Sequence, residues 1–197
     1  MPIDAKDVKD LRDQTGAGMM DCKHALEETK GDVEKAIELL RKKGLAALAK
    51  RTGKETSEGV IASYIHPGER LGVLVEVNCE TDFVARTPDF RGFVKEICMQ
   101  VAAANPLVVQ REELPQEDVE HEREIYRDQA RSQGKPDKII EKIVDGKIEK
   151  YYGEVCLLDQ PYIKDGDKKI SQLVEDIRMK VGENVHIKRF ARFRVGE

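Results

Sequence analysis

A short acidic and aromatic segment stands out in this sequence: LGVLVEVNCETDFVART, at positions 71 to 87. An apolar strand pattern ends at Val77, and Asp82 and Phe83 follow before a helix is predicted to begin near Pro88. Two alternatives are open for Phe83. It is either core beneath that helix, or an exposed ring beside carboxylates, where an aromatic side chain contributes about 2 kcal/mol or more to an interface.

No constellation of catalytic residues can be assembled from the sequence. GAGMM at 16–20 has Asp21 where a dinucleotide fingerprint needs its third glycine, and no strand precedes it. GKET at 53–56 lacks the features of a phosphate loop, and the motifs GxSxG and HExxH do not occur. We therefore expect no enzymatic activity and no cofactor.

The cysteines and histidines also argue against a metal centre. The four cysteines are far apart and form no CxxC pair, so we expect free thiols in a reducing compartment and neither a disulfide nor a zinc site. The histidines are scattered; His66 is predicted at a hairpin tip.

Composition indicates a folded protein with no general attraction for nucleic acid. The chain has 197 residues, 40% of them hydrophobic, and 34 basic against 38 acidic side chains give a net charge of -4. The sequence predicts no membrane span and no signal peptide, so we expect a cytoplasmic protein. The basic segment HIKRFARFR at 186–194 is interpreted as a strand with Phe193 and Val195 on its apolar face and most of its cations on the other.

Helical periodicity and breakers divide the chain into three parts. Residues 1–44 predict a bundle of three short helices, with Met20, Ala25 and Leu26 directed inward and the third helix ending at Gly44. Residues 45–57 are predicted as a partly helical linker.

Residues 58–197 predict an α+β core. Two strands flank the turn HPGER at 66–70, and a third strand lies at 185–195. Helices are expected near 90–101, 115–133, 136–152 and 169–181, the second of them carrying ion pairs between acids and arginines three residues apart. The fold class is therefore α+β, with a small antiparallel sheet backed by helices.

Two segments resemble the signatures of the elongation factor Ts family, the nucleotide exchange factors of the translation GTPase elongation factor Tu. They are LRDQTGAGMMDCKHAL at 11–26 and EVNCETDFVAR at 76–86, and the segments at 64–75 and 153–163 are also similar to the family. The resemblance implies a ubiquitin-associated-like bundle before an α+β core, which agrees with the division made from periodicity.

The resemblance also implies roles for particular residues. Thr81, Asp82, Phe83 and Val84 would contact the GTPase domain of elongation factor Tu, where Phe83 would insert between helices and displace the magnesium ion that holds GDP. In the bundle, a signature that includes Leu11, Arg12, Met19 and Met20 would contact the same domain, and Arg12 and Met19 are the better candidates. The chain itself would bind no nucleotide.

One departure from the longer family members bears on assembly. Those members have a duplicated core and a protruding helical hairpin, whereas TDFV and HPGER occur here only once. Short members are expected to form homodimers, in which one protomer supplies Phe83 and its mate supplies the surface around Tyr64, His66 and Leu71. We expect dimerisation through the sheet of residues 58–197.

Two other classes of function remain as alternatives. The chain could be a ubiquitin-type binding module joined to an unrelated scaffold, which accounts for residues 1–44 but leaves CETDFVA without a role. An enzyme is the weaker alternative, because no nucleophile and base are brought together.

Overall fold

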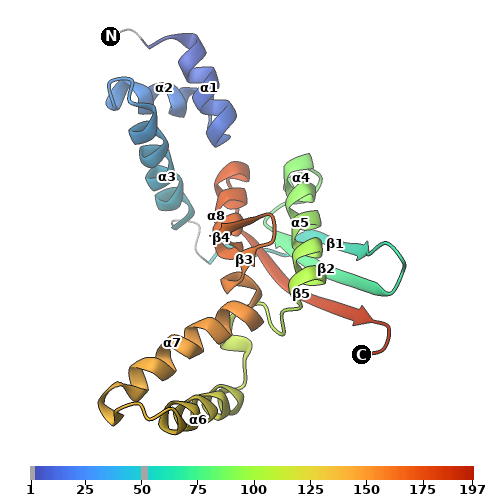
Figure 1. The fold of residues 1–197 in the computed structure, drawn as a ribbon. Helices are drawn as coiled ribbons and strands as arrows, with labels where there is room; N and C mark the ends of the chain where they lie inside the picture. The colour runs from blue at the N-terminus through green and yellow to red at the C-terminus, as the bar shows by residue number, and fades with distance from the viewer. Residues whose placement is uncertain (1–2, 50–52) are drawn as a thin grey trace. The chain divides into compact units, whose positions relative to one another are not determined.

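The computed structural model describes residues 3–49 and 53–197 (Figure 1). The chain divides into two compact units, one of residues up to 60 with 78–91 and 174–186, the other of 61–77, 92–173 and 187–197. Helices and a small antiparallel sheet make up the chain, so the predicted α+β class is confirmed. The division at 44 and 57 stays a prediction, and residues 50–52 of the expected linker lie outside the described residues.

The three N-terminal helices are α1 (Ala5–Thr15), α2 (Met19–Glu28) and α3 (Val33–Ala49). Gly16, with φ 68°, ends α1 in the left-handed conformation that glycine adopts without strain. The expected end of the third helix at Gly44 is wrong, because α3 continues to Ala49. A glycine weakens a helix by only about 1 kcal/mol relative to alanine, and the sequence LAALA that follows has high helix propensity.

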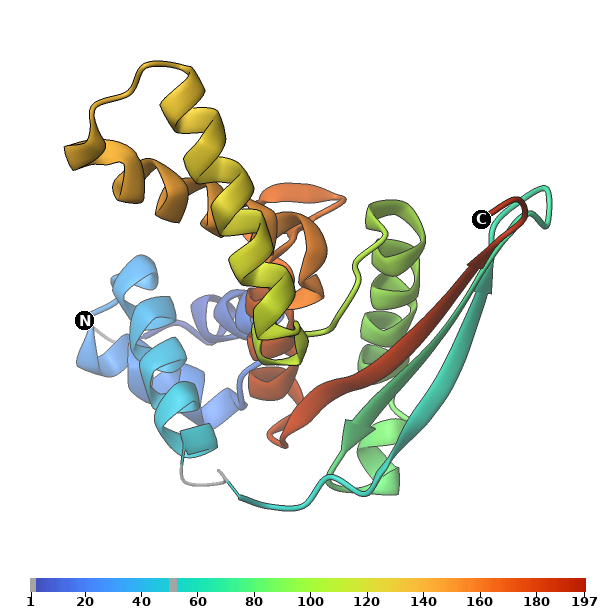
Figure 2. The ribbon, with the colours of Figure 1, turned by 90° about the horizontal axis from the view of Figure 1, so that it is seen from below.

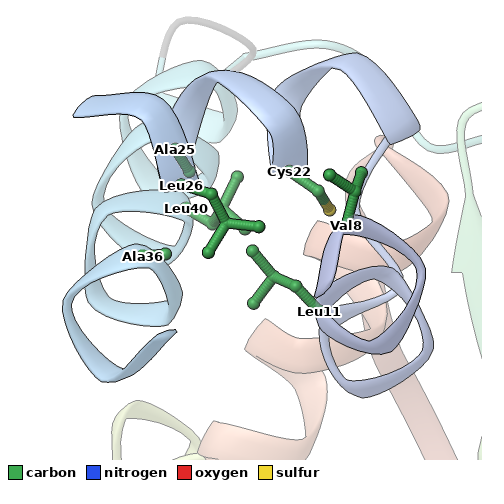
Figure 3. Close-up of a cluster of buried hydrophobic side chains, with 7 residues drawn as sticks. All are labelled: Val8, Leu11, Cys22, Ala25, Leu26, Ala36 and Leu40. Atoms are coloured by element: carbon green, nitrogen blue, oxygen red, sulfur yellow. The ribbon is translucent and has the colours of Figure 1, made fainter. Parts of the chain in front are cut away.

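Helical spacing on the three helices produces one apolar core, which Figure 3 shows. Its buried members are Val8, Leu11, Cys22, Ala25, Leu26, Ala36 and Leu40. The inward assignment of Ala25 and Leu26 is confirmed, but that of Met20 is wrong, since its side chain is 58% exposed. The buried positions of α2 are 22, 25 and 26, and a residue two places before Cys22 lies on the opposite side of the helix.

The three-stranded sheet has the order β1 (Glu58–Ile65), β2 (Leu71–Cys79), β5 (Val185–Arg194). The predicted hairpin is present, and the amide of His66 donates to the carbonyl of Leu71 across it. Its turn has positive φ at Gly68 (92°) and Glu69 (55°). In β2, buried Val73, Val75 and Val77 alternate with more exposed residues, so one face of this strand belongs to the core.

Two helices follow β2 along the chain. The single turn α4 (Asp82–Ala85) leads into α5 (Pro88–Ala104), which lies beside the sheet in Figure 2. The buried apolar residues of α5 recur at helical spacing and are Phe90, Phe93, Val94, Ile97, Cys98, Val101 and Ala102.

The terminal strand β5 alternates between buried and more exposed residues only at its start. Val185 and Ile187 are buried. Arg189 donates to Glu76 (Nε to Oε2, 2.6 Å). Glu76 alternates with the buried valines of β2 and therefore lies on the open face of the sheet. Arg192 donates instead to the carbonyl of Ala102 in α5.

The expected placement of Phe193 and Val195 on the buried face is consequently wrong: they are 69% and 58% exposed. Buried and more exposed residues alternate only at the start of β5, from Val185 to Ile187, so the alternation does not extend to Phe193 and Val195.

Two helices of the second unit, α6 (Gln116–Ser132) and α7 (Asp137–Val155), form a helical hairpin. Its core is formed by Ala130, Ile140, Val144 and Ile148. Arg127 donates to Glu141 (2.8 Å) and Arg123 to Asp145 (2.7 Å), so arginines of α6 pair with acids of α7 as well as within their own helix. The short chain therefore has a helical hairpin of its own.

The remaining elements connect this hairpin to the C-terminal helix. They are the short helix η2 (Leu157–Asp159) and the strands β3 (Pro161–Tyr162) and β4 (Asp165–Lys169), which lead into α8 (Ile170–Val181). Another short helix, η1 (Arg111–Glu113), lies before the hairpin, between α5 and α6. Gln100 and Gln160 are buried and hydrogen-bonded to each other at 3.1 Å. The small β3–β4 hairpin was not predicted, because its strands are polar and too short to show alternation.

Candidate functional site

The Thr81–Val84 segment forms a single capped helical turn between β2 and α5. Thr81 has extended backbone (φ -131°, ψ 153°) and caps α4, its hydroxyl accepting from the amide of Val84 at 3.4 Å. Over this single helical turn Phe83 points outward with 79% of its surface exposed, while Val84 is only 9% exposed. The alternative in which Phe83 is core is therefore wrong, and the inward position of this turn is taken by Val84.

An acid lies next to the exposed ring, as the sequence suggested. The carboxylate of Asp82 accepts from the guanidinium of Arg86 at 2.7 Å, one helical turn later, and both side chains are substantially exposed. The pair leaves an aromatic ring and an acid together on one surface turn.

Residues far along the chain hold this turn in place. Glu183, after α8, accepts two hydrogen bonds from Thr81, and Glu80 accepts one from the backbone of Asn184. Sequence reasoning missed Glu183, because 102 positions separate it from Thr81 and no local pattern marks it.

The hairpin residues that the resemblance indicated do lie together. The hydroxyl of Tyr64 and Nδ1 of His66 are 3.0 Å apart, their ring centroids are 6.0 Å apart, and Leu71 accepts the His66 amide at 2.9 Å. They belong to the second compact unit, whereas Thr81–Val84 belongs to the first. A role in binding stays a prediction for both groups.

The bundle offers a third candidate surface. Arg12 is exposed on α1, and Met19 and Met20 at the start of α2 are 45% and 58% exposed. Leu11 and Cys22 of the same signature are buried, so the signature divides between core and surface. Exposed methionines adapt to varied apolar partners, which suits a contact surface.

The thiols of this chain are poorly suited to nucleophilic chemistry. All four cysteines are free and buried, and burial raises the pKa of Cys98 and of Cys156 to about 11. Cys79, two residues before Thr81, donates to the Thr81 carbonyl at 3.1 Å, and burial raises its pKa as well.

Within residues 3–49 and 53–197 there is no group of three His, Cys, Asp or Glu side chains placed to hold a metal ion. In the same ranges no helix is long and apolar enough to cross a membrane. The most distinctive feature of the described residues is the exposed ring of Phe83 on a turn that is hydrogen-bonded to Glu183.

Fold and surface together define an α+β protein with a three-helix bundle and an exposed aromatic turn. A family model described as elongation factor TS matches residues 4–197. The chain is 60% identical to elongation factor Ts of Desulforamulus reducens, over 99% of this chain and 90% of that protein. It is 58% identical to elongation factor Ts of Caldanaerobacter subterraneus, over 99% of this chain and 98% of that protein. This chain belongs to the elongation factor Ts family.

Proposed function

We propose that this chain is the guanine nucleotide exchange factor of elongation factor Tu, and that the Thr81–Val84 turn is the part that opens the nucleotide site. The observation that carries the proposal is Phe83, which is 79% exposed on a turn of defined conformation in a member of this family. A ring held in this way enters an apolar gap of a partner with little loss of side-chain entropy.

The mechanism needs no catalytic side chain. Phe83 would insert between helices of the GTPase domain, with Asp82 beside it, and shift the elements that hold magnesium and GDP. Loss of the metal weakens phosphate binding, because the ion neutralises phosphate charge. The chain contacts the protein partner only and needs neither nucleotide nor nucleic acid, and its place of action is the cytoplasm.

Thermodynamic linkage fixes what such a factor can do. If the exchange factor weakens the binding of GDP to the GTPase by a given ratio, GDP weakens the binding of the exchange factor to the GTPase by the same ratio. The factor accelerates release because it binds while GDP and magnesium are still present and lowers the barrier to their departure. Either nucleotide can then bind, and the cellular excess of GTP sets the direction.

The bundle provides a second contact through Arg12, Met19 and Met20. Because it is covalently joined to the core, this contact raises the effective concentration of the Thr81–Val84 turn at the GTPase. Its loss would weaken the complex without altering the turn itself.

The open face of the sheet supports the homodimer. Large apolar side chains are exposed there or at its margin: Ile61, Ile65, Leu74, Phe193 and Val195, at 70%, 59%, 47%, 69% and 58%. A second copy would cover this face by packing sheet on sheet. The surface formed by Tyr64, His66 and Leu71 would then serve a GTPase engaged by Phe83 of the mate.

The ubiquitin-binding alternative is less well supported. The family match runs through the core to residue 197, including CETDFVA, which that alternative leaves unexplained.

The deciding experiment is release of fluorescent GDP from elongation factor Tu in the presence of excess unlabelled GDP. Addition of this chain should accelerate release in proportion to its concentration until the complex saturates. Heat-denatured chain is the control, and an unchanged release rate across a wide concentration range would contradict the proposed function.

A further inference from the structure

Two carboxylates, one on each side, join the turn between α8 and β5 to the segment that begins the Thr81–Val84 turn. Glu183 Oε2 accepts from the Thr81 amide at 3.1 Å, and Glu183 Oε1 accepts from the Thr81 hydroxyl at 2.7 Å. In return, Glu80 Oε1 accepts from the Asn184 amide at 2.8 Å. All of these residues belong to the first compact unit.

The Glu183 carboxylate also fixes the direction of the Thr81 hydroxyl. A carboxylate can only accept, so the hydroxyl must donate its single hydrogen to Glu183. Its lone pairs are then available to the amide of Val84, which is the cap of α4. Glu183 thus orients both the backbone and the side chain of the residue that begins the helical turn carrying Phe83.

The backbone before Glu183 is adapted to this position. The helix α8 ends at Val181, and the next residue, Gly182, turns the chain out of the helix with a φ of 71° while its amide donates to the Arg178 carbonyl at 2.9 Å. The side chain of Glu80 is 7% exposed, and its carboxylate lies 3.5 Å from the ammonium of Lys54, which compensates its charge. Glu183 therefore accepts hydrogen bonds from Thr81, and Glu80 accepts one from Asn184 and lies beside the ammonium of Lys54.

We propose that Glu183 is a positioning residue for nucleotide exchange, which acts by holding Thr81 so that Phe83 is presented in one orientation before the partner arrives. The proposal rests on the proposed function of Phe83. Without Glu183, the turn would have to be ordered during binding, and that ordering cost would reduce the productive encounters with the GTPase.

Two substitutions test this role. Glu183→Ala removes both acceptors, and Glu183→Gln keeps one acceptor oxygen of nearly the same shape. From the strength of charge-assisted hydrogen bonds, we expect Glu183→Ala to lower the second-order rate constant of GDP release by roughly tenfold or more, with Glu183→Gln restoring part of the loss. The matched control is Glu141→Gln, a hydrogen-bonded acid of the helical hairpin, which should leave the rate unchanged.

A double-mutant cycle separates positioning from general destabilisation. If Glu183 acts through Phe83, then Glu183→Ala should lower the rate in the wild type but change it less than about twofold when Phe83 is already alanine. A loss of folded protein would lower the rate by the same factor in both backgrounds, and that result would overturn the proposal. Wild-type rate in Glu183→Ala would overturn it as well.

A further variant keeps Glu183 and tests the proposal even if the Glu183 variants do not fold. Thr81→Val removes the donating hydroxyl and should also lower the rate; an unchanged rate would refute the positioning role. Failure of the wild-type chain to release GDP would instead contradict the proposed function, so the two failures are distinguishable.

Discussion

Phe83 and Phe90 are seven residues apart and have opposite environments, 79% and 0% exposed. Phe83→Ala should change the free energy of unfolding by less than about 0.5 kcal/mol, as surface substitutions usually do, and should abolish most of the exchange activity. Thermal unfolding and fluorescent GDP release measure the two effects.

Phe90→Ala is the matched control, with a buried ring removed from the start of α5. It should lower the free energy of unfolding by about 3–5 kcal/mol through the cavity that it creates. A Phe83→Ala protein that is as unstable as Phe90→Ala would show that the ring at 83 contributes to the core.

The sequence indicated the Thr81–Val84 segment as a candidate site but not the environment of every side chain. The sequence leaves two alternatives for Phe83, core or surface. A single aromatic residue in a short segment between a strand and a helix has no periodicity that would decide between them. Met20 and Phe193 were assigned inward from local pattern, and both are exposed. The first error comes from the phase of a short helix, and the second from extending alternation through the whole of β5, where buried and exposed residues alternate only at the start.

At the scale of elements, the bundle should contribute affinity and leave the chemistry of release unchanged. Replacing Met19 and Met20 together by serine should raise the concentration for half-maximal exchange by roughly tenfold, with the rate at saturation retained. A titration of GDP release against the variant measures both quantities.

Leu26→Ala provides the contrast within the same helix, since Leu26 is fully buried. It should unfold the bundle at a lower temperature by removing core packing. If the double serine variant titrates like the wild type, the methionines make no contact with the GTPase.

Two glycines with open space around them should respond to alanine in opposite directions. Gly182 has φ 71° and Gly146 lies inside α7, and a Cβ at either position meets nothing within 4 Å. Gly182→Ala should destabilise by about 1 kcal/mol because an L-residue is strained in the left-handed region. Gly146→Ala should stabilise by roughly 0.5–1 kcal/mol, as alanine does in a helix.

Denaturant unfolding of the two variants beside the wild type gives both values. If both substitutions changed the free energy of unfolding in the same direction, the turn after α8 would not depend on the conformational freedom of Gly182.

Most helices and the three main strands could be predicted because their apolar residues are periodic. The elements that escaped prediction have few apolar residues to mark them, as in β3 and β4, or depend on a balance of propensities, as where α3 continues through Gly44. The pairing of arginines in α6 with Glu141 and Asp145 in α7 could not be predicted either, because it depends on the packing of two helices.

For the whole molecule, we expect a dimer of twice 22.3 kDa that dissociates on dilution. Ile65→Asp, on the open face of the sheet, should produce the monomer, because an aspartate there must lose its hydration when the sheets pack. Sedimentation equilibrium over a range of concentrations measures the mass.

Ile139→Asp is the control, since Ile139 is an exposed isoleucine of the helical hairpin and should not affect assembly. Reducing agent should have no effect, because the four cysteines are free and buried. A wild-type mass of 22.3 kDa at every concentration, with full exchange activity, would contradict the dimer.

The hydrogen bonds between Thr81 and Glu183 have a consequence for the timing of synthesis. The Phe83 turn is translated about a hundred residues before the acid that holds it, which corresponds to roughly 5–20 s at bacterial or slower ribosome speeds. The last strand, β5, is completed later still. A nascent or truncated chain that stops before residue 183 has the aromatic ring without its support and the sheet without its third strand. Such fragments are therefore expected to leave the GTPase undisturbed, so that exchange begins only when translation of the factor itself is finished.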